Sequence, residues 1–141
     1  MTLPVHSPLG ASSYDRWGKS LGGCPGSIRQ CKGLVSTSSV YAEEGTAAHT
    51  LAYAILMGQP FGEADDETME AVRLYTDHVG SLADPKDDRV WVRYEQRFDL
   101  TKYFPMLYGT ADCVIYYKAS KKLIVIDYKH GAGVPVEAEN N

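Results

Sequence analysis

Asp127 and Lys129 stand at the end of an apolar segment, KLIVIDYK (residues 122–129). Charged groups at the end of a hydrophobic strand are unfavourable unless a partner or a function compensates them. Residues i and i+2 of a strand point to the same face, so this carboxylate and this ammonium group project together. The pair could act on a phosphate and its attacking water, or it could simply be an ion pair that closes a strand edge.

A second carboxylate, Asp112, is predicted to lie beside Asp127. TADCVIYY (residues 110–117) and the segment that ends at Lys129 are apolar runs joined by a polar turn at Ala119 and Ser120. An antiparallel hairpin with this turn places Asp112 opposite Asp127 or one residue away. Neighbouring carboxylates repel unless a cation or a proton lies between them, and hard oxygen ligands suit Mg²⁺ or Mn²⁺. The sequence therefore predicts a metal site at the end of the hairpin away from its turn.

The segment TAAHTLAYAILMG (residues 46–58) has the periodicity of a helix that could position a further ligand. Thr46 suits the N-cap and Gly58 suits the residue that ends the helix. One face carries His49 together with Ala52, Tyr53 and Leu56. A histidine on such a face is either a satisfied core residue or a metal ligand, and the helix alone leaves both alternatives open.

A second helix is predicted from Asp66 to Leu82, with acidic residues at its N-terminus. Its inward-facing residues are predicted to be Met69, Val72, Val79 and Leu82. A strand then runs from Val90 to about Phe98, because apolar and polar residues alternate there. This alternation places Glu95 on the face opposite to Tyr94.

Both faces of residues 122–129 are apolar, which is typical of a strand in the middle of a covered sheet. Helices followed by a β-meander predict an α/β fold built in layers. We expect one domain over residues 1–141, consisting of a loop-rich segment (1–38), a helical segment (39–82) and a β-meander that carries the metal site (88–136).

These motifs resemble a known family. The string GTADCVIYYKASKKLIVIDYKHGAG (residues 109–133) resembles the core of the PD-(D/E)XK nuclease superfamily, above all its RecB-like branch of CRISPR-adaptation nucleases and phage exonucleases. The G-x-x-D motif of that branch matches Gly109 to Asp112, its D-Y-K motif matches Asp127 to Lys129, and its G-x-x-x-H element matches Gly45 to His49. The resemblance spans about residue 12 to the end of the chain. It implies a restriction-endonuclease-like core, with a mixed central sheet flanked by helices.

The resemblance also implies roles for single residues. Asp112, Asp127 and Lys129 would be catalytic, and Mg²⁺ or Mn²⁺ would be held by both aspartates, His49 and the backbone carbonyl of Tyr128. An imidazole beside carboxylates favours Mn²⁺ over Mg²⁺.

Four more residues are candidates for the site. RecB-like members often carry a glutamate at the position of Glu95, which makes it an additional candidate ligand, although it could equally be a solvated strand residue. His130, Arg29 and Lys32 are candidates for binding the phosphates of the substrate.

Composition is that of an ordinary soluble protein, with 44% hydrophobic and 23% charged residues. The net charge of −4 argues against a general nucleic-acid coat but not against a local basic groove. No apolar run is long enough for a bilayer, so we expect no membrane partner and a cytoplasmic location. The odd number of cysteines predicts reduced thiols. Cys24 resembles the Cys-Pro of iron–sulfur relatives, but the chain lacks their other three cysteines, so no cluster is expected.

The RecB-like pattern continues with a helix that carries Q-x-x-x-Y, and this chain ends at VEAENN (residues 136–141), where that helix would begin. We therefore expect the N-terminal part of a longer nuclease, or a natural truncation. Without that helix a sheet face would be bare. We expect a second copy or a protein partner to cover it near residues 134–141.

Together these features predict a metal-dependent deoxyribonuclease that acts on DNA in phage or bacterial DNA processing or recombination. The alternative is a catalytically silent nuclease-like module that binds DNA or a protein partner. Incubation with linear DNA and Mn²⁺, beside Asp127→Ala and Lys129→Ala variants, would separate the two.

Overall fold

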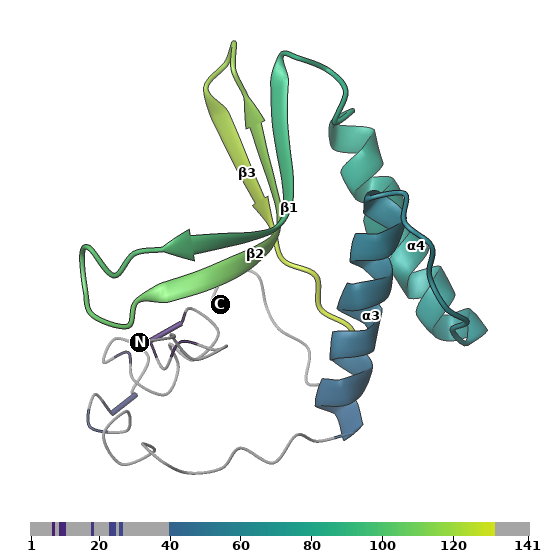
Figure 1. The fold of residues 1–141 in the computed structure, drawn as a ribbon, viewed down its shortest axis with the longest axis horizontal. Coiled ribbons are helices and arrows are strands. Elements are labelled where there is room, and N and C mark those ends of the chain that lie inside the picture. The colour runs from purple at the N-terminus through teal and green to yellow at the C-terminus, as the bar shows by residue number, and fades with distance from the viewer. Residues whose placement is uncertain are drawn as a thin grey trace. The chain divides into compact units, whose positions relative to one another are not determined.

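The computed structural model describes residues 40–131 and seven isolated residues before them: Ser7, Leu9, Gly10, Gly18, Gly23, Cys24 and Gly26. The elements of the described part are α3 (Val40–Leu56), α4 (Asp66–Leu82), β1 (Val90–Asp99), β2 (Tyr108–Tyr117) and β3 (Lys122–Ile126) (Figure 1). The chain forms two compact units. The helical unit comprises residues 37–95 and 112–141, and the hairpin unit comprises residues 1–36 and 96–111.

Helix α3 begins at Val40, so the predicted N-cap at Thr46 is wrong. The Thr46 hydroxyl donates a hydrogen bond to the Ala42 carbonyl at 2.8 Å, one turn back inside the helix. Alanine and glutamate before Thr46 are strong helix formers, and Glu43 lies favourably in the first turn. The predicted end of the helix is confirmed, because Gly58 has a φ of 63° and the Gln59 N–H donates to the Ala54 carbonyl at 2.8 Å.

Helix α4 has the predicted bounds, Asp66–Leu82. Asp65 is the N-cap residue, and its carboxylate accepts a hydrogen bond from the Thr68 N–H at 2.8 Å. The predicted inward-facing residues are confirmed, since Val72 and Val79 are fully buried and Met69 and Leu82 pack against the core. Two further residues of α4, Tyr75 and Thr76, are also buried.

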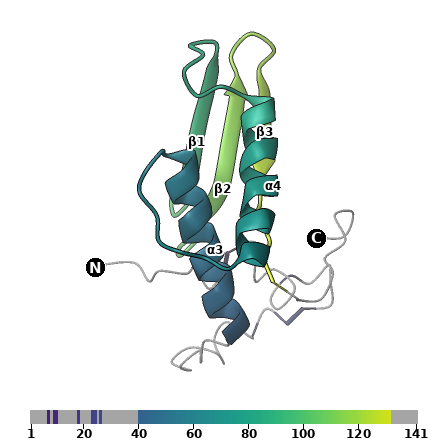
Figure 2. The same cartoon turned by 90° about the vertical axis from the view of Figure 1, so that its right-hand side faces the viewer.

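Within the helical unit, α3 and α4 cover the same face of the sheet (Figure 2). The residues that meet between these layers are apolar. They include Ala48, Leu51 and Ala52 from α3, Val72 and Val79 from α4, and Val92, Cys113 and Ile115 from the strands. The predicted layering of helices on a sheet is therefore confirmed.

The described sheet has the order β1-β2-β3, and β2 pairs with β3 in antiparallel orientation. Cys113 is paired with Ile126, the last residue of β3, so the register of the hairpin is the one the sequence predicted, and the pairing of Asp112 with Asp127 just beyond it stays a prediction. The prediction that residues 122–129 form a central strand is not met in the described sheet, where β2 lies between β1 and β3 and β3 ends at Ile126. Leu123 and Val125 are 59% and 58% exposed. The prediction of a mixed sheet is likewise not met in the described strands, which form antiparallel hairpins.

The described part of the hairpin unit is the tip of the β1–β2 hairpin with a few residues from the start of the chain. The Leu100 N–H donates to the Leu107 carbonyl at 3.0 Å, and the Arg97 guanidinium lies 4.6 Å from the centre of the Tyr108 ring. The Ser7 hydroxyl donates to the Met106 carbonyl. Most of the predicted loop-rich segment (1–38) lies outside the described residues. No helix of the described part is both long and apolar enough to cross a membrane.

Candidate metal centre

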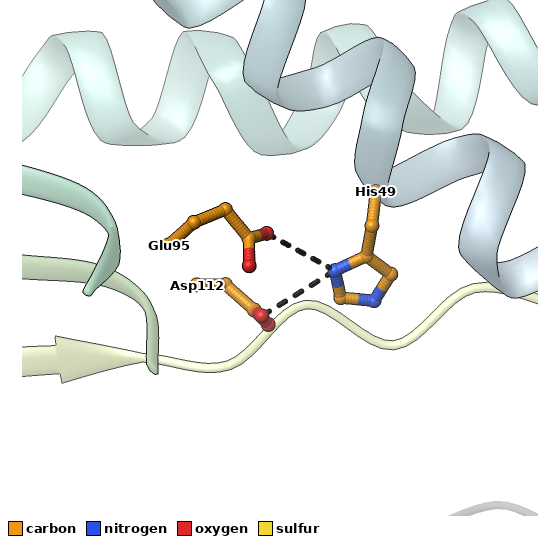
Figure 3. A group of neighbouring side chains, drawn as sticks. All are labelled: His49, Glu95 and Asp112. Atoms are coloured by element: carbon orange, nitrogen blue, oxygen red, sulfur yellow. Dashed lines mark ion pairs between the residues drawn. The ribbon is translucent and has the colours of Figure 1, made fainter. Parts of the chain in front are cut away.

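His49, Glu95 and Asp112 converge in the helical unit from α3, β1 and β2 (Figure 3). One possible ligand atom of each lies within 4.8 Å of the others. His49 Nδ1 is 3.3 Å from Asp112 Oδ1 and 3.8 Å from Glu95 Oε1. Both carboxylates thus point to the same imidazole nitrogen, although the three residues are far apart in the sequence.

Glu95 reaches this cluster through an unusual backbone conformation. Its φ is 47°, in the left-handed region that residues with a side chain rarely adopt. In a regular strand Glu95 would face away from Tyr94, yet both residues line the same small cavity. The predicted alternation therefore ends at Tyr94. Such a conformation costs on the order of 1 to 2 kcal/mol, and residues of this kind cluster at functional sites.

Asp112 is the most enclosed member of the cluster, with 12% of its side chain exposed. One carboxylate oxygen faces His49, and the other accepts a hydrogen bond from the Tyr128 N–H at 2.5 Å. Burial disfavours the ionised form, but the hydrogen bonds from His49 and Tyr128 prevail and hold the pKa of Asp112 below its usual range. The carboxylate is therefore ionised at neutral pH and fixed in direction.

The charges of the cluster act on one another. The hydrogen bond to Asp112 raises the pKa of His49, and burial opposes this shift. Burial, followed by repulsion from Asp112, raises the pKa of Glu95. With a neutral imidazole, two carboxylates share one partly buried space, and this arrangement attracts either a proton or a metal cation.

The donor set fits a divalent cation. An ion bound at roughly 2.1 Å joins ligand atoms at most about 4.2 Å apart, so the observed separations need little contraction. The adjoining cavity has a volume of about 10 Å³, enough for one water molecule. It is lined by His49, Ala52, Tyr53, Leu56, Tyr75, Tyr94, Glu95 and Asp112.

The chain was also compared with known proteins. Residues 6–141 match a family model described as "Protein of unknown function (DUF2800)". The chain belongs to the DUF2800 family. No solved structure matches it.

Asp127 and Lys129 of this DUF2800 protein form an ion pair beside the cluster. Lys129 Nζ is 2.8 Å from Asp127 Oδ2, and the two side chains are 60% and 56% exposed. Asp127 directly follows β3, but its carboxylate is not one of the three groups that converge. The charge of Lys129 reaches the site, since it slightly opposes the rise in the pKa of His49 and adds to the lowering of the pKa of Asp112. A ligand role for Asp127 stays a prediction.

Tyr128 contributes its ring and its N–H to the surroundings of the cluster. The buried ring stacks on Tyr75 with centroids 4.6 Å apart and lies 5.3 Å from the His49 ring. The predicted ligand role of its carbonyl stays a prediction. The Tyr128 hydroxyl and His130 Nδ1 are 3.2 Å apart, so His130 is held near the site. Arg29 and Lys32 lie outside the described residues.

Tyr75 lies near this centre, and the sequence did not predict a role for it. It lies three residues after Val72 and four before Val79, on the buried face of α4. That periodicity predicts burial. The periodicity of α4 does not indicate that Tyr75 would line a cavity together with carboxylates from two strands.

Proposed function

We propose that this protein is a metal-dependent nuclease of the RecB-like type, with a restriction-endonuclease-like core, that hydrolyses phosphodiester bonds of DNA. The observation that carries this proposal is the convergence of His49, Glu95 and Asp112 within 4.8 Å of one another. His49 and Asp112 belong to the same motifs that resemble the nuclease family. The resemblance and the convergence of these side chains therefore both support the proposal.

An imidazole and two carboxylates are a ligand set for Mn²⁺, or for Mg²⁺ with a lower preference. Asp127 would join them by leaving its ion pair with Lys129. Leaving the pair costs little, because an exposed ion pair contributes only about 0 to 1 kcal/mol. When bound, the ion would supply positive charge to a substrate phosphate and make a water molecule more acidic.

The protein's own groups prepare the site for that chemistry. The Tyr128 N–H fixes one oxygen of Asp112, so the other is directed at His49 Nδ1. Lys129 places an ammonium group at the exposed side of the cluster, where a phosphate would arrive from solvent. There it would offset the negative charge that builds on the phosphate, or orient the attacking water. His130 lies on the same segment and would contact a neighbouring phosphate.

One observation favours a second candidate, a catalytically silent module that binds DNA or a protein. Lys129 and Asp127 neutralise each other at 2.8 Å, which leaves neither free to act on a substrate. The exposed Leu123 and Val125 of β3 would suit a protein partner or a second copy of the chain. In this case the metal-like cluster would serve only to hold α3 against the strands.

Cleavage of linear DNA distinguishes the two functions. The protein is incubated with labelled DNA and Mn²⁺ or Mg²⁺, beside Asp112→Asn and Lys129→Met variants. Asp77→Asn, on the exposed side of α4, is the matched control. A nuclease loses activity in the first two variants and retains it in the control. Equal products from all four proteins, or no metal-dependent product from the wild type, would favour the silent module.

A further inference from the structure

The Tyr75 hydroxyl is buried without a hydrogen-bond partner. Tyr75 is 9% exposed, and its hydroxyl is the one buried side-chain polar atom of the described residues that lacks a partner. Two other tyrosine hydroxyls of the core have partners. Tyr117 donates to the Leu82 carbonyl at 2.6 Å, and the Tyr128 hydroxyl meets His130. A buried hydroxyl without a partner is unfavourable, so its position requires an explanation.

The ring of Tyr75 is fixed by its neighbours. It stacks on Tyr128 at 4.6 Å with an interplanar angle of 16°, inside the core between α4 and the strands. Phenylalanine would fill the same volume and make the same stack without the unsatisfied group. Packing therefore accounts for the ring and leaves the hydroxyl unexplained.

Tyr75 is also part of the wall of the cavity beside the candidate metal centre. Tyr75 lines this cavity together with His49, Glu95 and Asp112. Burial raises the pKa of Tyr75, and the charges of Cys113, Asp112 and Glu95 raise it further. The group therefore remains protonated and is available as a hydrogen-bond donor. The cavity volume of about 10 Å³ admits a single water molecule.

We propose that Tyr75 is a positioning residue for the metal ion, donating a hydrogen bond to one water molecule that occupies the cavity and belongs to the ion's hydration shell. This inference rests on the proposed function, because it requires a cation at His49, Glu95 and Asp112. The water has enough polar partners there, namely the ion, the Tyr75 hydroxyl and the nearby carboxylate of Glu95. The hydroxyl makes no hydrogen bond to either carboxylate, so its donor is available for this water.

A water molecule held by Tyr75 would influence which cation the site binds. A site that holds one water on its inner side suits a cation that retains part of its hydration shell, as Mg²⁺ and Mn²⁺ do. Groups that hydrogen-bond to the ligands of a metal typically change its affinity by about 10- to 100-fold. Tyr75 could act in this way, because it lines the cavity and its hydroxyl has no other partner among the described residues.

Tyr75→Phe tests this role, because it removes one oxygen atom and keeps the ring. Titration with Mn²⁺, followed by calorimetry, should show about tenfold weaker binding than in the wild type. The metal-free variant should melt at the same temperature or roughly 2 to 4 °C higher, since an unpaired hydroxyl is removed. Relaxation of water protons by the bound Mn²⁺ should also change, because the ion loses a held water.

Tyr117→Phe is the matched control. It removes a hydroxyl that does have a partner, the Leu82 carbonyl, so it should lower the melting temperature and leave the Mn²⁺ affinity unchanged. Unchanged Mn²⁺ affinity in Tyr75→Phe would overturn the role of Tyr75 and leave the metal site standing. A lower melting temperature of metal-free Tyr75→Phe would overturn it as well, because the hydroxyl would then have a partner. If the wild type binds no Mn²⁺, the proposed metal site fails and this inference fails with it.

Discussion

Two groups of charged residues lie near the open end of the β2–β3 hairpin, and they differ in almost every physical respect. His49, Glu95 and Asp112 come from three elements and are drawn together in a partly buried space. Asp127 and Lys129 are two residues apart in the sequence, and each is more than half exposed. The first group has an excess of negative charge, whereas the second is neutral by itself.

The difference shows what makes a set of charges a binding site. An exposed pair of opposite charges is satisfied by its own partner and by water. Carboxylates that lie close together, one of them largely enclosed, favour a proton or a cation between them. The fold brings Glu95 to the cluster with a left-handed backbone, which is unfavourable on its own. The cluster therefore has the features expected of a functional site, and the ion pair has those expected of its rim.

Of the variants that test this comparison, Asp112→Asn should reduce the stabilisation by Mn²⁺ the most. The amide keeps the size of the side chain but loses the charge that holds both His49 and the cation. We expect the Mn²⁺-dependent rise in melting temperature to disappear, because an ion that no longer binds the folded state cannot stabilise it. Thermal unfolding with and without Mn²⁺ measures this, with Asp77→Asn as the control. A full Mn²⁺ shift in Asp112→Asn would contradict the assignment of the cluster.

Asp127→Asn should have an intermediate effect on Mn²⁺ binding. In our account Asp127 joins the ion from the rim, so its loss weakens Mn²⁺ binding without abolishing it. A tenfold loss of affinity would reduce the stabilisation at a saturating Mn²⁺ concentration by about 1.4 kcal/mol. The same unfolding experiment gives the result. If Asp127→Asn removes the Mn²⁺ shift while Asp112→Asn keeps it, the ranking of the two groups is the reverse of ours.

Glu95→Gly should change stability and metal binding in opposite directions. Glycine adopts a φ of 47° without strain and removes the repulsion between Glu95 and Asp112. We expect the metal-free variant to gain about 1 kcal/mol in free energy of unfolding, and Mn²⁺ binding to weaken. Glu95→Gln serves as the comparison, because it removes the charge and keeps the strained backbone. If Glu95→Gly is less stable than Glu95→Gln in denaturant unfolding, the left-handed conformation is not a source of strain.

The change of protein stability with pH should be the smallest of these effects. The pKa of His49 is raised above 6.5 in the folded protein, chiefly by the hydrogen bond with Asp112. The protonated imidazole thus contributes stability that is fully present below about pH 6.5 and is lost as the pH rises through the raised pKa. Asp112 has a lowered pKa, and its contribution is lost only at acidic pH.

Metal binding needs the neutral imidazole, so the Mn²⁺ shift should grow with pH over the range in which metal-free stability falls. His49→Gln should flatten both trends between about pH 6 and pH 8. Unfolding curves at several pH values, with and without Mn²⁺, provide the measurement. An equal pH dependence in the variant and the wild type would mean that another group is responsible.

Features of this fold that depend on neighbouring residues in the chain could be predicted from the sequence. The bounds of α4 follow from the Asp65 cap and the apolar periodicity, and the β2–β3 register follows from a short turn. The start of α3 was missed because Thr46, a good capping residue, stands within a run that already favours a helix. The motif positions of His49 and Asp112 were also available from the sequence.

Features that depend on tertiary packing could not be obtained in this way. The apolar character of both faces of β3 does not reveal which strand lies at the edge. The left-handed Glu95 reverses the face that strand alternation assigns to it. The unpaired Tyr75 hydroxyl depends on how α4 packs against the strands. Glu95 and Tyr75 line the same cavity as the predicted motif residues His49 and Asp112.

The most direct test of the central claim is the position of a bound ion. Crystals grown with Mn²⁺ would be measured near the manganese absorption edge, and the anomalous signal would locate the ion. We expect a peak roughly 2.1 Å from ligand atoms of His49, Glu95 and Asp112 together, with a weaker peak or none in Asp112→Asn crystals. No peak at this cluster at saturating Mn²⁺, or a peak bound by Asp127 alone, would contradict the account.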